Sequence, residues 1–393
     1  MKIGYLIPEF PAQTHAFFWR EAEGLQQAGL SVRFLSTRRP RDQTSRHAFT
    51  MQARAATFYL FPPPLGALVW LVLHVAAAWR GFRYVLGLRE TPFLRRLPLL
   101  GLLWPAAALV RLARAEGLAH IHIHSFANAA HLGALARLMG GPPYSLTLHG
   151  DLPVYGRDHA AKVAGAAFVT AVTAPLCETI RAACPGAQPV NLSMGVDADR
   201  FRPGPTRSGG GPLRIVSVAR LNYVKGHVHL LSAMAARISA GADLTYDIAG
   251  DGPYRDEIAA KIVELGLSGR VRLLGPLSED AVLGLLQQSD VFALTSFGLG
   301  EAAPVAVMEA MACGLPVICS RIGGTADMIT DGADGLLVPQ QDEGAITDAL
   351  AALEHPPTRA RIGKAARERA EKAFDYRAKA QVLANLIRTG SRK

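Results

Sequence analysis

Two glutamates with seven residues between them, Glu301 and Glu309, are the residues whose types and spacing point most directly to chemistry. Residues 290–295 (DVFALT) have the composition of a buried strand, and the run from Pro304 to Gly314 predicts a helix. The intervening loop would present free backbone N–H groups at a helix N-terminus, where phosphate binds well. At ~1.5 Å rise per residue the two glutamates lie roughly 12 Å apart, too far for the paired carboxylates of a glycosidase. They fit an elongated ligand, such as a nucleotide sugar.

Two cations, Arg220 and Lys225, follow another predicted strand in the segment ARLNYVKG. A pair of positive side chains can stabilise a diphosphate leaving group without a metal ion. The second predicted domain, residues 213–375, contains no Asp-x-Asp pair of the kind that a metal-dependent sugar transferase uses. The sequence therefore implies no metal and no cofactor besides a nucleotide-sugar co-substrate.

The segment around the two glutamates resembles the retaining family-four glycosyltransferases, which have two glutamates with seven residues between them followed by Ala-Met-Ala-x-Gly-x-Pro-Val. Here that tail is AMACGLPV, residues 310–317. Residues 219–226 (ARLNYVKG), 246–253 (YDIAGDGP) and 331–339 (DGADGLLVP) agree in order, and residues 5–25 resemble transferases that build exopolysaccharides such as colanic acid. The resemblance implies the GT-B fold, an α/β architecture of two Rossmann-like doubly wound parallel-sheet domains facing a cleft.

The resemblance also implies a role for each candidate residue. Glu301 and His149, the histidine of LTLHGD, are the implied catalytic residues, and Glu301 would hold negative charge near an oxocarbenium-like centre. Donor phosphate binding falls to Arg220, Lys225, Ala303 and Pro304, and nucleotide or ribose binding to Glu309, Gly250 and Gly252. The candidates on the acceptor side, in loops after predicted strands, are Thr14, His15, His124 and Asp151. Thr14 could equally cap a helix.

The first half of the chain also contains a histidine cluster, His120, His122, His124 and His131. Strand alternation places the first three on one face. No cysteine or carboxylate nearby in the sequence completes a metal site, so metal binding is disfavoured.

A different class of protein is suggested by Gly298, Gly300 and Ala303, which form a G-x-G-x-x-A dinucleotide fingerprint between a strand and a helix. An NADP-dependent oxidoreductase would then use Arg321 for the 2′-phosphate. Glu301 inside the loop would repel pyrophosphate, and no catalytic Lys/Tyr or Cys arrangement accompanies it. A noncatalytic membrane-associated subunit is a further alternative, which the presence of Glu301, Arg220 and Lys225 disfavours.

Composition narrows the partners and the compartment. A net charge of +10 and a pI near 9.7 predict an anionic partner. No zinc finger, RNP-like aromatic motif or basic recognition helix is found in the sequence, so nucleic acid is not expected. The four cysteines form no C-x-x-C pair and are typical of core residues in a reducing compartment. With no evident signal peptide, a cytoplasmic protein is expected.

Residues 60–114 contain two apolar runs bordered by arginines. The first, residues 65–79, would span only about 22 Å as a helix, short of the ~30 Å hydrocarbon core, and the second, 97–110, contains Pro98 and Pro105. Apolar segments interleaved with arginine favour a surface that dips into an anionic inner leaflet. The alternative is a pair of ordinary core helices.

Alternating strand and helix patterns occur in both halves of the chain. They predict an acceptor domain over residues 1–203, a Gly/Pro-rich linker over 204–212 and a donor domain over 213–375. Residues 376–393 are expected to form a helix and tail that pack back on the first domain.

These features together predict a retaining, metal-independent hexosyltransferase that uses a nucleotide-diphosphate sugar such as a UDP-sugar. The expected acceptor is a lipid-linked saccharide in exopolysaccharide or surface polysaccharide biosynthesis, at the cytoplasmic face of the inner membrane. A glycolipid synthase that acts directly on a membrane lipid is the nearest alternative.

Overall fold

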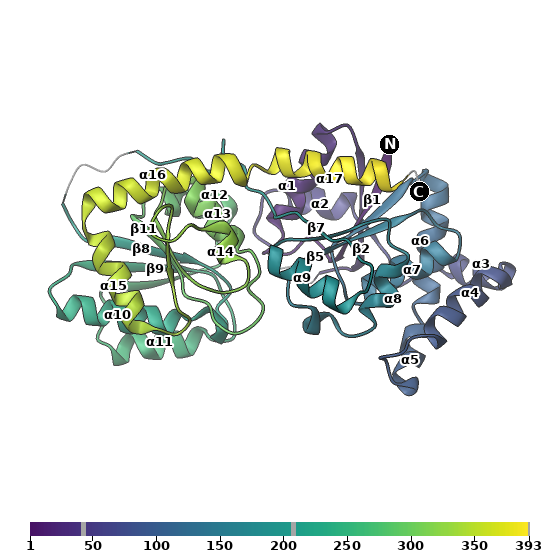
Figure 1. Ribbon diagram of the computed structural model, residues 1–393, viewed down its shortest axis with the longest axis horizontal. Coiled ribbons are helices and arrows are strands. Elements are labelled where there is room, and N and C mark those ends of the chain that lie inside the picture. Colours follow the sequence, from purple (N-terminus) through teal and green to yellow (C-terminus); the bar gives the residue numbers. More distant parts are fainter. Residues whose placement is uncertain (41–44, 206–209, 392–393) are drawn as a thin grey trace. The chain divides into compact units, whose positions relative to one another are not determined.

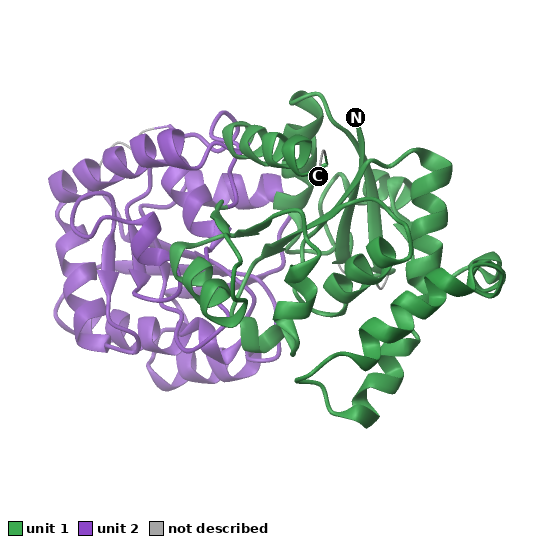
Figure 2. Cartoon of the chain, turned by 45° about the vertical axis from the view of Figure 1, so that its right-hand side comes forward, with its two compact units in different colours: residues 1–193, 377–393 green, residues 194–376 purple. Residues whose placement is uncertain are grey.

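The structure is a computed structural model that describes residues 1–40, 45–205 and 210–391. It divides into two compact units, residues 1–193 with 377–393 and residues 194–376 (Figure 2). Each unit is built on one parallel β-sheet with helices packed on it (Figure 1). The predicted α/β class with two doubly wound sheets is therefore confirmed.

The first unit has a seven-stranded sheet in the order β3-β2-β1-β4-β5-β6-β7. The strand order reverses between β1 and β4, so the loops after these strands lie at the switch point where doubly wound sheets bind ligands. The strands are β1 (Lys2–Glu9), β2 (Ser31–Arg38), β3 (Phe58–Tyr59), β4 (His120–Ile123), β5 (Tyr144–Leu148), β6 (Val169–Ala171) and β7 (Val190–Asn191). The helices are α1 (Ala16–Gln27), α2 (Thr50–Ala56), α3 (Leu65–Leu73), α4 (Val75–Leu86), α5 (Phe93–Leu100), α6 (Leu103–Glu116), α7 (Asn128–Leu138), η1 (Leu152–Tyr155), α8 (His159–Ala164) and α9 (Ala174–Ala183).

The second unit has a six-stranded sheet in the order β10-β9-β8-β11-β12-β13, and its switch point lies between β8 and β11. Its strands are β8 (Leu213–Val218), β9 (Leu244–Ala249), β10 (Val271–Gly275), β11 (Val291–Leu294), β12 (Val317–Ser320) and β13 (Leu336–Val338). Its helices are η2 (Tyr223–Lys225), α10 (His227–Ser239), α11 (Arg255–Glu264), α12 (Glu279–Gln287), α13 (Val305–Ala312), α14 (Thr325–Met328), α15 (Glu343–Glu354) and α16 (Pro356–Ala373).

The C-terminal helix α17 (Tyr376–Gly390) packs on the first unit beside α1 (Figure 1). Its apolar face reaches the core through Leu383 and Ile387, which are buried in one cluster with Leu25 of α1. The amphipathic pattern of α17 explains this position, because its apolar stripe needs a partner surface.

The boundary between the units differs from the predicted one at residue 203. Residues 194–203 pack with the second unit, because Phe201 is fully buried there and the Arg367 guanidinium donates to the Ala198 and Phe201 carbonyls at 2.9 and 2.7 Å. Part of the predicted linker, residues 206–209, lies outside the described residues.

The apolar segment of the first unit folds as four helices, α3 to α6, rather than as two long ones. The predicted helix over residues 65–79 is broken at His74, and its halves α3 and α4 are bent by 98°. Residues 93–116 are long enough to cross a membrane and contain an 18-residue stretch with mean hydropathy 1.4, but 39% of that stretch is buried in the protein. Length and composition alone are weak grounds for a span, because core helices meet the same criterion.

A buried carboxylate ties this helical segment to the loop before α8. Asp158, just before α8, accepts the N–H groups of Arg89, Glu90 and Thr91 at 2.8, 2.9 and 3.0 Å, and also the Thr91 hydroxyl. Burial raises the pKa of Asp158, but the Thr91 hydroxyl and these N–H groups outweigh it and lower the pKa overall. The turn between α4 and α5 is therefore held by charge-assisted hydrogen bonds.

Candidate active site

The loops after β8 and β11 are hydrogen-bonded to each other at the switch point of the second unit. The Thr295 hydroxyl donates to the Gly226 carbonyl at 2.9 Å, and the Phe297 N–H donates to the Val224 carbonyl at 2.8 Å. Gly226 has a positive φ of 68°, and a Cβ there would lie 2.0 Å from the Thr295 carbonyl oxygen. The glycine of VKG therefore allows the two loops to approach closely.

This approach brings Lys225 and Glu301 together. One oxygen of the Glu301 carboxylate, Oε2, pairs with the Lys225 ammonium and also accepts the Ser296 hydroxyl at 2.9 Å. The side chains are 11% exposed for Glu301 and 17% for Lys225. The site thus fixes a negative and a positive charge side by side in a partly desolvated loop, where electrostatic interactions are stronger than in water.

Arg220, the other predicted phosphate cation, is exposed. Its side chain forms no hydrogen bond or ion pair with any described residue, so its charge is available to an anionic ligand. Two predicted nucleotide-binding glycines position the Arg220 loop. A Cβ on Gly250 would lie 1.8 Å from the Ala219 carbonyl oxygen, and one on Gly252 would lie 2.3 Å from the Leu221 carbonyl oxygen. The glycines of GDG therefore have a packing role beside the cation.

The start of α13 presents backbone N–H groups near Glu301, as the sequence predicts. Within the described chain the N–H groups of Ala302, Ala303 and Val305 donate to no protein acceptor. Pro304 has no N–H to offer, and its extended backbone begins the helix. These N–H groups and the helix dipole favour an anion here. Glu309 lies one turn further along α13 and is half-buried.

In the first unit, two predicted residues from different loops meet. His124 follows β4 and His149 follows β5, and His124 Nδ1 lies 2.9 Å from His149 Nε2. Burial lowers the pKa of each imidazole to about 3, so both are neutral near pH 7. Asp151 lies two residues after His149 and directly precedes the turn η1.

Thr14 and His15 precede α1. The N-cap role considered for Thr14 is wrong, because His15 is the N-cap residue and its side chain makes no cap hydrogen bond. Thr14 is exposed, and the His15 ring lies parallel to Phe10 with ring centroids 6.3 Å apart.

The expectation that no carboxylate lies near the histidine cluster is wrong. Glu21 of α1 lies beside His122 and His124, and one ligand atom from each falls within 4.8 Å of the others. Sequence reasoning missed Glu21 because about a hundred residues separate it from these histidines. Both nitrogens of His122 contact hydroxyls, Ser145 Oγ at 2.7 Å and Thr147 Oγ1 at 3.0 Å. The hydrogen-bonding groups of this imidazole are therefore satisfied without a metal.

An Asp-x-Asp pair does occur outside the predicted donor domain, as Asp197 and Asp199. The Asp197 carboxylate accepts the backbone N–H groups of Asp199 and Arg200 at 3.1 and 3.3 Å. This pattern is a local turn rather than a pair of carboxylates aimed at one ion.

Comparison with known proteins gives one consistent result. Residues 201–369 match the family model described as Glycosyl transferases group 1. The chain is 27% identical to the putative colanic acid biosynthesis glycosyltransferase WcaL of Escherichia coli (strain K12), over 98% of this chain and 99% of that protein. It is 32% identical to the amylovoran biosynthesis glycosyltransferase AmsK of Erwinia amylovora, over 52% of each.

Solved structures give the same fold at low sequence identity. The structure of HepE from Anabaena in complex with UDP and glucose superimposes with a TM-score of 0.73 at 18% identity, covering 98% of both chains. Sucrose-phosphate synthase from Thermosynechococcus elongatus gives 0.75 at 21% identity, covering 99% of this chain and 98% of that one.

Proposed function

We propose that the chain is a retaining, metal-independent hexosyltransferase that uses a UDP-sugar, because residues 201–369 match the family model of the group 1 glycosyl transferases and the chain has the GT-B fold. The acceptor in this proposal is a lipid-linked saccharide in exopolysaccharide or surface polysaccharide assembly. The names of WcaL and AmsK, which refer to colanic acid and amylovoran biosynthesis, support the polysaccharide pathway. The observation that carries the proposal is the Lys225–Glu301 pair beside free N–H groups at the β8/β11 switch point. A glycolipid synthase is the second candidate. Family membership replaces the dinucleotide interpretation of Gly298, Gly300 and Ala303.

The donor half of the mechanism follows from the charges in the second unit. Lys225, Arg220 and the N–H groups before α13 would bind the diphosphate and stabilise the charge that develops when the sugar leaves. Glu301 would stabilise the positive charge that develops on the sugar, because its carboxylate is fixed by Ser296 and Lys225 before the reaction begins. Glu309 is assigned to the ribose hydroxyls, and His149 of the first unit to the transferred sugar.

The membrane part of the proposal rests on the surface of α3, α4 and α5. These helices expose large apolar side chains, namely Leu65, Leu68, Val69, Val72, Leu73, Val75, Trp79, Phe93, Leu94 and Leu97. Between residues 60 and 115 the sequence has seven arginines, and Glu90 is its single acid. A basic apolar surface of this kind fits an anionic leaflet and supports the proposal that the protein acts at the inner membrane.

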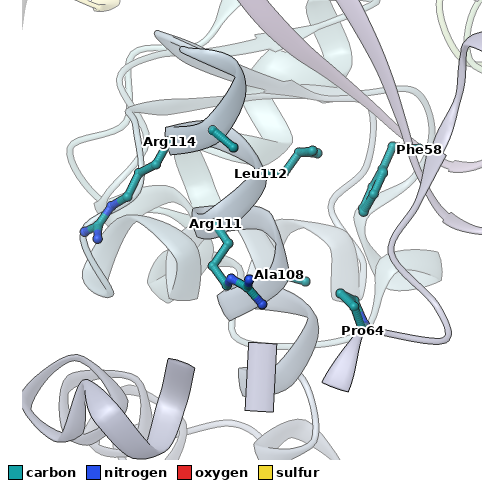
Figure 3. A pocket seen from close by; sticks show the side chains of 7 residues that line it. Phe58, Pro64, Ala108, Arg111, Leu112 and Arg114 are labelled. Atoms are coloured by element: carbon teal, nitrogen blue, oxygen red, sulfur yellow. The ribbon is translucent and has the colours of Figure 1, made fainter. Parts of the chain in front are cut away.

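A hollow beside the start of α3 is lined by both arginine and apolar side chains (Figure 3). It is lined by Phe58, Pro64, Ala108, Arg111, Leu112 and Arg114. The Arg114 guanidinium lies over the Trp70 ring, 5.7 Å from its centroid, and a Cβ on Gly66 would lie 2.3 Å from Arg111 Nη1. Arginine beside aromatic and aliphatic groups suits the headgroup level of a membrane.

The donor assignment is tested by measuring thermal stability and sugar transfer with UDP-, GDP-, ADP- and dTDP-sugars. A ligand that binds only the folded state raises stability by RT ln(1 + [L]/Kd), so the correct donor should shift the melting temperature most. Stabilisation and turnover with a UDP-sugar would support the proposal. Stabilisation by NADP⁺ with no response to any nucleotide sugar would refute it.

The membrane assignment is tested by flotation of the protein with vesicles of phosphatidylglycerol and phosphatidylcholine. Arg83 and Arg95 suit substitution, because their side chains bond to no described residue, whereas Arg80 and Arg96 donate to backbone carbonyls. We expect Arg83→Gln/Arg95→Gln to weaken binding by about 1 kcal/mol per charge, and added salt to do the same. Lys261→Gln on α11 of the second unit is the control; this side chain is 27% exposed and pairs with Glu264. No flotation of the unmodified protein at low salt would make a soluble acceptor the better hypothesis.

A further inference from the structure

A polar chain in the first unit connects a carboxylate to His149. Glu21 of α1 accepts the Tyr5 hydroxyl on Oε1 at 2.8 Å. The same oxygen lies 3.2 Å from His124 Nε2, which is close enough for electrostatic attraction but outside hydrogen-bond geometry. His124 Nδ1 in turn lies 2.9 Å from His149 Nε2. The His124 side chain is 0% exposed, so this chain crosses the interior of the unit.

The chemistry of the carboxylate determines where the protons lie. A nitrogen lone pair 3.2 Å from an ionised carboxylate oxygen would be repelled by it, whereas an N–H group would be attracted even without hydrogen-bond geometry. The His124 nitrogen that faces Glu21, Nε2, is therefore assigned the hydrogen. Each imidazole carries one hydrogen, because burial keeps both neutral. His124 Nδ1 is then a lone pair, and His149 Nε2 must donate to it.

The remaining nitrogen of His149 has no partner. Its Nδ1 is shielded from solvent and forms no hydrogen bond within the described residues. A buried acceptor without a donor costs roughly 1 to 3 kcal/mol, so a bound ligand that supplies a donor would recover this free energy. With the proton assignment above, the ligand group must be a hydroxyl or another donor, and a phosphate oxygen would be repelled.

We propose that Glu21 is a positioning residue that acts through His124, fixes the Nε2-protonated tautomer of His149 and thereby selects a sugar hydroxyl as the partner of Nδ1. The link to sugar rests on the proposed function. The tautomer does not, and it can be measured without any substrate.

The first measurement is the tautomer of His149 in the full chain, from two-bond ¹⁵N–¹H correlations of histidine-labelled protein assigned with His149→Asn. We expect Nε2 to be protonated in the unmodified protein. Glu21→Gln should give a mixture of tautomers, because an amide can donate or accept. Glu23→Gln is the matched control, since Glu23 lies on the same helix and accepts only the Trp19 indole N–H, at 2.8 Å, among the contacts described for it.

The second measurement is steady-state transfer. We expect Glu21→Gln to lower kcat on the order of tenfold to a hundredfold with a smaller change in KM, as for partners that orient a catalytic imidazole. Glu23→Gln should match the unmodified protein. Combining Glu21→Gln with His149→Asn should cost little more than His149→Asn alone, because both act through one imidazole.

Three outcomes would overturn the inference. They are an Nδ1-protonated His149 in the unmodified protein, an unchanged tautomer in Glu21→Gln, and stoichiometric Zn²⁺ binding that Glu21→Gln abolishes, which would make Glu21, His122 and His124 a metal site instead. The first result decides the matter even if Glu21→Gln does not fold. A normal tautomer pattern in a protein that transfers no sugar would refute the proposed function and leave the proton assignment standing.

Discussion

Replacing Glu301 by Gln should change nucleotide binding and catalysis in opposite directions. The side chain keeps its shape and can still accept the Ser296 hydroxyl, but the charge that Lys225 pairs with is removed. Lys225 is then free to interact with the diphosphate alone. We therefore expect the variant to bind a nucleoside diphosphate more tightly while it transfers sugar more slowly.

The magnitudes follow from the charges. A carboxylate about 7 Å from a phosphate, at an effective dielectric constant of about 40, repels it by about 1 kcal/mol, so its removal should tighten binding roughly fivefold. Loss of a preorganised charge that stabilises the transition state typically costs about 3 kcal/mol, or on the order of a hundredfold in kcat.

The assay is calorimetric titration with the nucleoside diphosphate together with single-turnover transfer. Glu264→Gln is the control, because Glu264 forms a similar carboxylate–lysine pair with Lys261 on the exposed surface, 64% exposed, and should change neither quantity. Turnover within a few-fold of the unmodified protein, or weaker binding of the diphosphate, would refute the assignment of Glu301 to the reaction centre.

Three further outcomes are expected. Arg220→Ala should weaken binding of the nucleoside diphosphate about tenfold to a hundredfold, and EDTA should leave transfer intact; activity abolished by EDTA and restored by Mg²⁺ would contradict this metal-free assignment. Gly250→Ala should lower both thermal stability and diphosphate affinity, because its Cβ would meet the Ala219 carbonyl at 1.8 Å, whereas Gly269→Ala, with no atom within 4 Å, should change neither. Burial lowers the pKa of His120 and His227 to about 4 and of His124, His131 and His149 to about 3, so the unfolded chain binds these protons first. The free energy of unfolding should therefore be highest above pH 6.5 and fall as the pH decreases toward 4, by on the order of 1 kcal/mol per pH unit or more in total, and a flat urea-denaturation profile would contradict this.

The donor site was predictable because its parts follow two strands that are neighbours in one parallel sheet. Arg220, Lys225 and Glu301 stand directly after β8 and β11, and parallel strands bring their carboxyl ends to one edge whatever the intervening helices do. The approach of the loops through Gly226 and Gly250 was not predictable, since it depends on carbonyl positions about 30 to 70 residues away in the chain.

Two other features could not be predicted from the sequence, for physical reasons. Glu21 reaches His124 because α1 packs on the sheet in one rotation about its axis, and a one-residue change in that rotation would point it elsewhere. The break at His74 separates two helices in a run with no glycine or proline at that position, so local propensity gives no sign of it.

Asp158 gives the apolar helices a fixed angle. Because its carboxylate is bonded to three consecutive N–H groups at the α4–α5 turn, the pair cannot swing without stripping a buried anion of its donors. We expect the helices to enter a bilayer as a rigid wedge whose depth is dictated from inside the domain. Asp158 would then determine the height at which an acceptor headgroup meets the protein, although it touches neither lipid nor sugar. Asp158→Asn would change how deeply the helices enter the bilayer and leave the chemistry of sugar transfer unchanged.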